Sequence, residues 1–552
     1  MDTTNSKLKI LALGGAEVNR NMHVYETEKD IIIVDCGIGF PDENMPGIDV
    51  IIPDISYLKD KKQKIRAIFL THGHQDHWGS LVYLLPSLPK VPVYGTKLTI
   101  GLASTKSDQE RMKIDYREVD YKTPITVGDF TVDYIHVNHS VPDSANLVIH
   151  TPVGVIYHGS DFKFDWTPVD EAPADVQKIA RAGSEGVLLM LEDCLRVEKS
   201  GYTPSEQKVQ ETFDQQIQKC KGKFIVTTTA SSISRIQQAV NVAIKYGRKV
   251  VFAGRSMEQN AEAAIRLGFL KLPIDQIVSV DNARSHASQD LLILVTGAFG
   301  QGNSALARMA NGDHKIKITE GDFVTFSQDP IPGTETSVDN LINSLIKTGA
   351  EVFYSSILDD LHVSGHESAD GLKLMLNLVR PKYVLPIGGD LRQIKQYQKM
   401  VKTMGYKDEQ IIVPYEGQIV EVTNGKVVVS GKTEVKNIMV DGLGIGDVGT
   451  IVLRDRITMA EDGIVMVLLP YEKATGEMVG DIDIVSRGFV YMKESDELIG
   501  EAKEVVRKIL ADRGKEIHNM GYLKRVLAEE LERFFFTSTR RRPLILPVVM
   551  EI

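Results

Sequence analysis

Cysteine is scarce in this 552-residue chain, and long apolar runs are absent. The three cysteines, Cys36, Cys194 and Cys220, are odd in number and widely spaced, which argues against a disulfide framework and against a thiolate metal site. No apolar run approaches the length of a membrane span, and the N-terminal segment lacks the basic start and apolar core of a signal peptide. These absences predict a cytoplasmic protein that does not associate with a membrane.

Positive charge is not in excess either. The formal net charge is −10, from 64 Lys and Arg against 74 Asp and Glu. Taken alone, this balance argues mildly against nucleic acid as a partner, because phosphate binding requires positive potential, although a local basic groove stays compatible with it. The length exceeds what one hydrophobic core supports and predicts two to four domains.

A dense group of metal-ligand side chains lies in residues 71–77, where His72, His74, Asp76 and His77 fall within six residues. The preceding residues 65–70 are apolar and strand-like, so these side chains extend from a strand end and a tight loop, where they can converge on one point. Neutral imidazoles and carboxylates are the ligands that zinc prefers. One or two loop histidines usually only form hydrogen bonds, but this set at this spacing predicts a metal site.

Further ligands are expected from other strand ends, because one loop cannot complete a hydrolytic metal centre. His139 and Asp161 lie in polar segments downstream of the motif, and Asp161 follows a strand-like run. Alone, each would be interpreted as a turn residue, since short polar side chains favour turns. After three histidines, both become candidate ligands.

The character of the chain changes near residues 200 and 430. Thr203 followed by Pro204 and Glu206 predicts a helix start in which Thr203 caps and Glu206 completes a capping box. From there to about residue 360, strands alternate with helices, which predicts a mostly parallel sheet. The glycine-rich residues 441–449 predict a linker or extended loop, and the strands and two helices beyond them predict a small α+β domain.

Several motifs resemble known families. The ligand set resembles that of the metallo-β-lactamase superfamily, and His362-Val363-Ser364-Gly365-His366 resembles the signature of its β-CASP nucleic-acid-processing branch. Six further segments resemble the ribonuclease J family over nearly the whole chain, namely residues 162–165, 254–257, 308–312, 330–333, 440–444 and 541–547.

The resemblance implies an α/β fold of three domains. An αββα metallo-β-lactamase sandwich would comprise residues 1–200 and 362–432, interrupted by a β-CASP α/β domain at 201–361. A linker at 433–455 would lead to a small C-terminal α+β domain at 456–552. The composition change near residue 200 and the return near residue 362 agree with this division.

The resemblance also implies roles for the ligands. His72, His74 and His139 would hold one Zn²⁺, Asp76 and His77 would contribute to a second site for Zn²⁺, Mn²⁺ or Mg²⁺, and Asp161 would bridge the two. Paired metals lower the pKa of a bridging water and stabilise the oxygens of a phosphoryl displacement. Asp35 would orient the ligand loop, and Asp441 would lie near a structural cation such as Ca²⁺.

Members of this family degrade RNA, as 5′-to-3′ exonucleases on monophosphorylated ends and as endonucleases, in RNA processing (including rRNA) and decay. By resemblance, Asp76, Asp161 and His366 would be catalytic, and Ser364 with the backbone amides of residues 362–366 would bind phosphate. Ser231, Ser232 and Ile233 would lie near the terminal nucleotide, since hydroxyls and backbone N–H groups suit a phosphate pocket. Without the resemblance, ordinary loop and helix capping would be the preferred interpretation of both segments. Homodimers or homotetramers are also implied.

The chain departs from the family at substrate-facing and metal-facing positions. Gly388 stands where the family has a metal-binding histidine, and either Asp390 or a water could fill the gap. Ser234 replaces another histidine, in the segment 232–235, and residues 14–19 and 297–301 differ as well. Gly388 predicts a weakened second metal site, and the changes at substrate-facing motifs predict altered activity or a specialised paralogue.

Three hypotheses follow. The first is a metal-dependent ribonuclease resembling ribonuclease J. The alternative is a poorly active or non-catalytic paralogue that acts as a subunit beside an active partner, and Gly388 motivates it. A small-molecule metallo-β-lactamase hydrolase is the least favoured, because such an enzyme needs no long βαβ insertion and no equivalent of residues 362–366.

Overall fold

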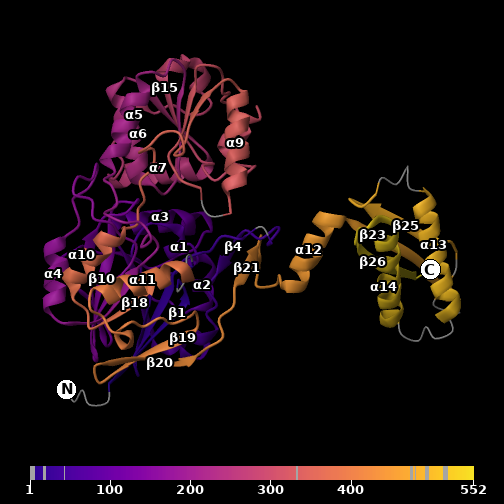
Figure 1. Ribbon diagram of the computed structural model, residues 1–552, viewed down its shortest axis with the longest axis horizontal. Helices are drawn as coiled ribbons and strands as arrows, with labels where there is room; N and C mark the ends of the chain where they lie inside the picture. The colour runs from indigo at the N-terminus through magenta and orange to yellow at the C-terminus, as the bar shows by residue number, and fades with distance from the viewer. Residues whose placement is uncertain are drawn as a thin grey trace. The chain divides into compact units, whose positions relative to one another are not determined.

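The computed structural model describes residues 6–15, 20–42, 44–330, 333–472, 477–478, 480–490, 496–513 and 520–551 (Figure 1). Residues 16–19 of the altered N-terminal loop, and 331–332 of the 330–333 motif, lie outside this set. The chain divides into two units, Met1–Phe40 with Ile51–Ile438, and Pro41–Val50 with Met439–Ile552. Among the helices of the described residues, none has the length and apolar character needed to cross a membrane.

Two facing sheets form the base of the first unit. The eight-stranded sheet has the order β20 (Lys426–Lys432), β19 (Gln418–Thr423), β1 (Lys7–Gly14), β2 (Met22–Glu26), β3 (Ile31–Val34), β5 (Ile65–Phe69), β6 (Val93–Gly95) and β7 (Tyr116–Glu118). The six-stranded sheet has the order β18 (Tyr383–Ile387), β12 (Val187–Asp193), β11 (Gly154–Gly159), β10 (Ser144–Thr151), β9 (Phe130–Val137) and β8 (Ile125–Val127). The associated helices are α1 (Gln75–Trp78), α2 (Leu81–Leu84), α3 (Lys97–Gln109), α4 (Val176–Ser184), α10 (Ala369–Val379) and α11 (Leu391–Thr403).

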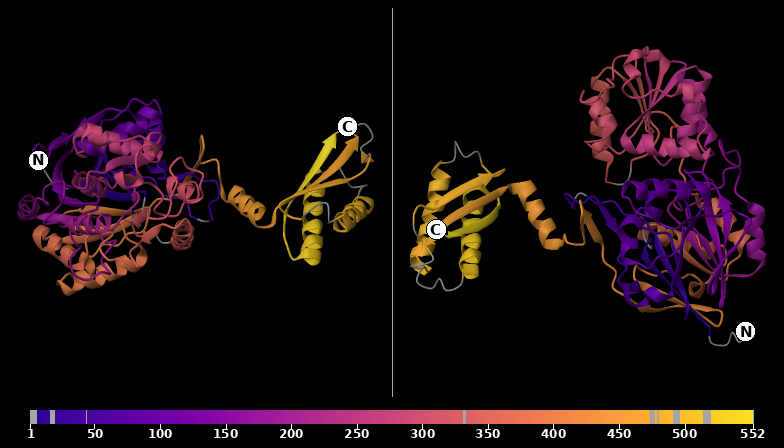
Figure 2. Two further views of the ribbon diagram at one scale, coloured as in Figure 1. Left: turned by 90° about the horizontal axis from the view of Figure 1, so that it is seen from above. Right: turned by 180° about the vertical axis from the view of Figure 1, so that it is seen from behind.

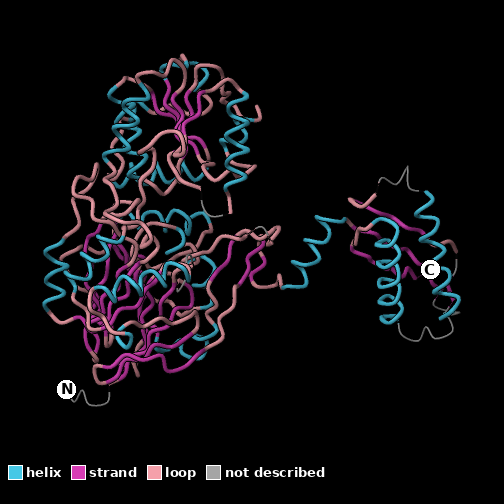
Figure 3. Tube along the Cα trace, viewed as in Figure 1, coloured by secondary structure: helices cyan, strands magenta, loops and turns pink. Residues whose placement is uncertain are grey.

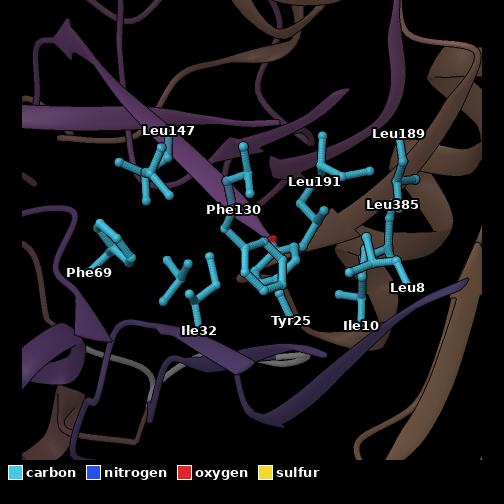
Figure 4. Packing of buried hydrophobic residues seen from close by; sticks show 14 of the residues in the cluster. Leu8, Ile10, Tyr25, Ile32, Phe69, Phe130, Leu147, Leu189, Leu191 and Leu385 are labelled. Carbon is cyan, nitrogen blue, oxygen red and sulfur yellow. The ribbon is translucent and has the colours of Figure 1, made fainter. Parts of the chain in front are cut away.

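The core between these sheets follows from strand alternation. Along β9, Phe130, Val132 and Tyr134 point into the space between the sheets, while Ile135 and Val137 belong to the opposite face. Figure 4 shows Ile32 and Phe69 of one sheet on the same core as Phe130 of the other. The opposite face of the six-stranded sheet is covered by α4, α10 and α11, which completes an αββα sandwich.

A parallel sheet is inserted between β12 and β18. Its order is β14 (Lys249–Ala253), β15 (Leu291–Val295), β13 (Phe224–Thr227), β16 (Phe323–Phe326) and β17 (Glu351–Phe353). Its helices are α5 (Gln207–Ile217), α6 (Ile233–Lys245), α7 (Arg255–Leu267), α8 (Ala305–Ala310) and α9 (Glu335–Lys347), and they lie on both sides of the sheet (Figure 3). All strand pairings in it are parallel, which confirms the βαβ prediction.

The helix start predicted at Thr203 is wrong. Helix α5 begins at Gln207, and Glu206 occupies its N-cap position without a side-chain capping bond. Thr203 instead donates its hydroxyl to His366 O at 2.7 Å. The local pattern of a capping box was present, but tertiary partners bind both side chains.

The second unit contains β21 (Ile438–Asp441), β22 (Gly444–Ile445), α12 (Thr450–Asp462), β23 (Ile464–Glu472), β24 (Glu477–Met478), β25 (Asp483–Arg487), α13 (Asp496–Arg513), α14 (Met520–Thr539) and β26 (Leu544–Glu551). The first residue of β21, Ile438, still belongs to the first unit. Within the described residues, one further short strand is β4 (Val50–Ile52). The glycine-rich residues 441–449 are not all extended loop, because β21 and β22 pair as a hairpin. Strand β23 pairs with β24 and β25 antiparallel and with β26 parallel. Helices α13 and α14 pack on one face of this sheet (Figure 2), where Phe535 is fully buried.

These parts confirm the expected fold class, a metallo-β-lactamase sandwich with an inserted α/β domain and a small C-terminal α+β domain. Strand β18 returns beside β12 in parallel register, with Ile387 opposite Asp193. The residues that follow the insertion are thereby brought back to the strand ends that carry the predicted ligands.

Candidate metal centre and substrate site

Four predicted ligands converge beyond the end of β5. His74 Nδ1 lies 3.2 Å from His72 Nε2 and 3.0 Å from His139 Nε2. Asp161 Oδ2 lies 3.6 Å from His72 Nε2 and 3.7 Å from His139 Nε2. These four residues form one of the two groups of potential metal ligands found in the described residues.

The donor set fits a tetrahedral ion. Zinc bonds of about 2.0–2.1 Å to nitrogen and oxygen place neighbouring donors about 3.3 Å apart in a tetrahedron. The distances of 3.0 to 3.7 Å between these donors bracket that value. Burial lowers the pKa of His72 and His139 well below the ordinary value and that of His74 to about 3, so all three imidazoles are neutral, the form that binds a metal.

Hydrogen bonds fix the orientation of these imidazoles. His139 Nδ1 lies 2.7 Å from Gly365 O and donates to it, which leaves Nε2 free as a ligand. His74 Nε2 lies 3.1 Å from Ser140 Oγ. Gly365 belongs to the 362–366 motif, so a backbone carbonyl of this motif orients the His139 ring through the nitrogen that faces away from the metal position.

Asp76 and His77 lie beside the same carboxylate. His77 Nε2 is 3.4 Å from Asp161 Oδ2 and 3.7 Å from Asp76 Oδ2. Asp35 accepts hydrogen bonds from Thr71 N at 2.8 Å and from His77 Nδ1 at 2.7 Å, so it orients both the loop and the ring. However, the Asn21 side-chain amide nitrogen lies 2.9 Å from His77 Nε2. A cation bound to His77 Nε2 would therefore have to displace the Asn21 amide.

Gly388 supplies no side chain at the position where the resemblance implies a histidine ligand for a second ion. A Cβ built on Gly388 would have only Asp193 Oδ1 within 4 Å, at 3.4 Å. Asp390 is exposed and lies at the N-cap of α11, where it forms a capping box with Gln393, and neither group of potential ligands found in the described residues includes it. Asp390 as a substitute ligand stays a prediction.

Asp193 is a site residue that the motif analysis missed. It ends β12, and its Oδ2 lies 2.7 Å from His366 Nδ1. Asp161, Asp193 and His366 form the second group of potential ligands in the described part of the chain. Burial alone would lower the pKa of His366, but Asp193 and Asp161 raise it to about 9, so its imidazole is positively charged at neutral pH. A carboxylate at the end of a buried strand was the available signal.

The expected substrate residues lie around this cluster but differ in accessibility. Ser232 Oγ is 3.5 Å from Ser140 O, so the start of α6 reaches the segment of His139. Ile233 and Val363 have buried side chains and can contribute only backbone groups. Ser364 Oγ accepts from His366 N at 3.1 Å, which makes residues 364–366 a tight turn.

His362, expected at the substrate, and Asp441, expected near a structural cation, each have a cationic partner. His362 lies beside the Arg235 guanidinium, and burial together with that charge lowers its pKa to about 4. Asp441 forms an ion pair with Arg456, and neither group of potential ligands found in the described residues includes it.

Facing sheets with a histidine–carboxylate cluster at their strand ends, interrupted by a parallel-sheet domain, define a metallo-β-lactamase-type protein of the β-CASP class. Residues 15–179 match the metallo-beta-lactamase superfamily, and 357–414 match the Zn-dependent metallo-hydrolase RNA specificity domain. Residues 221–345 match the ribonuclease J beta-CASP domain, and 451–552 match the ribonuclease J C-terminal domain. The chain belongs to the ribonuclease J family.

Full-length relatives support this assignment. Ribonuclease J2 of Bacillus subtilis (strain 168) is 39% identical over 551 residues, and Ribonuclease J 1 of Streptococcus pyogenes serotype M3 is 36% identical over 560 residues. Ribonuclease J 2 of Staphylococcus aureus (strain NCTC 8325) is 34% identical over 553 residues. Each alignment covers 99% of both chains. A crystal structure of a protein of unknown function from Enterococcus faecalis V583 superposes with a TM-score of 0.53 at 15% identity, over 75% of this chain and 100% of that one, which bears on the fold alone.

Proposed function

We propose that this protein is a metal-dependent ribonuclease that degrades 5′-monophosphorylated RNA in the 5′-to-3′ direction and also cleaves RNA internally. The observation that carries the proposal is the convergence of His72, His74, His139 and Asp161 at tetrahedral spacing in a chain of the ribonuclease J family. The residues present fit a zinc ion at this first position.

The second position has a weaker donor set. Asp76, His77 and Asp161 remain, but Gly388 supplies no side chain and the Asn21 amide lies against His77 Nε2. Carboxylate-rich sites favour Mn²⁺ or Mg²⁺ over zinc, so we assign any second ion to one of these. When bound, the ions would activate water and stabilise charge on the phosphate oxygens.

The protein side chains would handle the proton and the phosphate. His366 carries a positive charge held by Asp193, and its Nε2 lies 3.9 Å from Asp161 Oδ2, at the edge of the metal cluster. It is therefore placed to stabilise the scissile phosphate and to give a proton to the leaving oxygen. Ser364, Ser231 and Ser232 with neighbouring backbone amides would hold the flanking and terminal phosphates.

The test measures metal stoichiometry and RNA decay on the same preparation. Protein loaded with Zn²⁺ and Mn²⁺ is expected to shorten 5′-monophosphorylated RNA, and Asp76→Ala is expected to lose this activity. If the loaded wild-type protein leaves such RNA as intact as the Asp76→Ala control does, the catalytic proposal fails.

A second candidate function rests on the altered second site. A chain that holds only the first ion would cleave RNA slowly. Such a chain would serve as a subunit of a hetero-oligomer with an active paralogue. The ribonuclease role, by contrast, goes with homodimers or homotetramers. Co-purification with a second ribonuclease J chain would favour the subunit role.

We also propose a reducing, cytoplasmic location. The three cysteines are buried and unpaired, which supports this proposal.

A further inference from the structure

The segment Thr203–Glu206 carries the chain from the metallo-β-lactamase sandwich into the inserted domain, and Glu206 in it has a fully satisfied buried carboxylate. Its residue exposure is 3%. Oε1 accepts from Lys163 Nζ at 2.9 Å. Oε2 accepts from Arg235 Nη2 at 2.9 Å and from Gln238 Nε2 at 2.7 Å. Arg235 and Lys163 hold the pKa of Glu206 well below its usual range against the opposing effect of burial, so the carboxylate is charged.

The first partner connects Glu206 to the metal centre. Lys163 is fully buried and lies two residues after the ligand Asp161. Its backbone N donates to Asn138 O at 2.8 Å, next to the ligand His139. The Glu206 backbone N donates to Asp165 Oδ2 at 2.8 Å, so the segment 161–165 is bound from two directions.

The second partner connects Glu206 to both expected substrate segments. Arg235 lies in the first turn of α6, two residues after the segment 231–233, and is 1% exposed. Its Nη1 donates to Ser327 Oγ at 2.7 Å and to Leu361 O at 3.4 Å, and Nη2 reaches Val363 O at 3.5 Å. Ser327 Oγ donates in turn to Leu361 O at 2.6 Å. The start of the 362–366 motif is thus bound to the start of α6.

The charges in this network balance, with Lys163 and Arg235 against Glu206 and Asp165, at Nζ–Oε1 and Nη2–Oε2 distances of 2.9 Å. A buried carboxylate that binds two cations from different domains fixes the distance between the segments that carry them. Apolar packing alone is not directional and would not fix this distance.

We propose that Glu206 is a positioning residue, which sets the 231–233 and 362–366 segments relative to the metal ligands and thereby determines RNA affinity without contacting RNA. The proposal rests on the proposed function, since the two segments matter only if RNA binds there. Misplacement of substrate-binding groups by about 1 Å can cost about a hundredfold in rate, so an effect on binding is large enough to measure.

The experiment compares Glu206→Gln with the wild-type protein, both metal-loaded. The probe is a 5′-monophosphorylated oligoribonucleotide with phosphorothioate linkages, which resists cleavage. Glu206→Gln is expected to bind it about tenfold more weakly or worse, with unchanged metal content per chain. The matched control is Asp322→Asn, because Asp322 is also a fully buried carboxylate paired with a lysine (Lys223 Nζ, 2.8 Å), but at the opposite end of the parallel sheet.

Several outcomes decide the matter. Unchanged affinity in Glu206→Gln overturns the proposal, and so does an equal loss in Asp322→Asn, which would indicate general destabilisation. If Glu206→Gln does not fold, Ser327→Ala removes the Oγ bonds to Arg235 Nη1 and Leu361 O, which lie one step further along the same network, and leaves every buried charge paired. Unchanged affinity in that variant also overturns the proposal. If the wild-type protein binds no RNA, the proposed function fails instead, and amide hydrogen exchange still tests the positioning role: exchange should rise in residues 229–235 and 361–366 of Glu206→Gln but not of Asp322→Asn.

Discussion

At the residue scale, the backbone of Gly388 decides what can be restored at the second metal site. Its φ of +69° lies in the left-handed region, where a side chain costs about 1–2 kcal/mol. Gly388→His is therefore expected to lower the thermal midpoint slightly but to raise the number of Mn²⁺ or Zn²⁺ ions retained per chain, because a Cβ there meets only Asp193 Oδ1. Metal analysis after gel filtration measures this. Gly388→Ala carries the same strain without a ligand, and equal metal content in the two variants would contradict the expectation.

Asp170 carries a testable pH dependence at the domain junction. Burial raises its pKa from 3.8 to about 6, and Oδ2 has no hydrogen-bond partner in the described residues, while Ser234 Oγ lies 3.3 Å from Oδ1. The pKa of Asp170 is higher in the folded state than in the unfolded state, so ionisation of its carboxyl group lowers the free energy of unfolding. This loss is complete above about pH 6 and absent below pH 3.8, the unfolded-state pKa.

Asp170→Asn keeps the bond to Ser234 and removes the buried charge. It is expected to stabilise the protein by about 3 kcal/mol at pH 7.5, since one pKa unit corresponds to about 1.4 kcal/mol. The gain should shrink as the pH falls below 6 and vanish near 3.8. Thermal midpoints of both proteins across this range provide the measurement, and a gain independent of pH would rule out the buried charge as its cause.

The sequence was sufficient to predict which residues cluster here but not how they are held. Three histidines and an aspartate in six residues identify ligands because few other arrangements use that spacing. Asp193 was missed because a single carboxylate at a strand end is too common to mark a site by itself, and its partner His366 lies 173 residues away. Only the return of β18 beside β12 brings these residues together.

At the element scale, a substitution at the N-terminus of α11 distinguishes a helix-capping role of Asp390 from a metal-binding role. Asp390 and Gln393 form a reciprocal capping box two residues after Gly388. Asp390→Ala is expected to cost about 1 kcal/mol, as the loss of an N-cap usually does, with metal content unchanged. Chemical unfolding and metal analysis on one preparation provide the measurement. Loss of an ion in this variant would return Asp390 to the ligand set.

Helix starts show why local patterns and tertiary partners can disagree. Both α11 and α5 follow segments with capping residues, yet only α11 uses them as a box. Near α5, Glu206 binds Lys163 and Arg235, because buried charges without partners cost far more than an unfilled cap. Propensity and spacing cannot reveal such long-range competition.

At the scale of the whole molecule, the alternation of strands and helices predicted a mostly parallel sheet, which was confirmed, whereas its insertion into the sandwich was implied only by the resemblance. The share of residues 41–50 in the second unit was not predicted. Asp49 N donates to Val440 O at 2.9 Å, and Gly442 N donates to Asp49 Oδ2 at 2.8 Å. Pairing between segments almost 400 residues apart has no signature in either segment.

The two units have separate hydrophobic cores, so a core defect in one is expected to leave the other intact. Phe535 is fully buried in the second unit, with its ring centroid 5.0 Å from that of Phe489. Phe535→Ala is expected to destabilise this unit by about 3–5 kcal/mol through the cavity it leaves. Hydrogen exchange should rise across residues 464–551, whereas residues 65–77 and the metal content per chain should match the wild-type protein. Loss of metal in parallel with exchange would mean that the metal centre depends on the folding of the second unit.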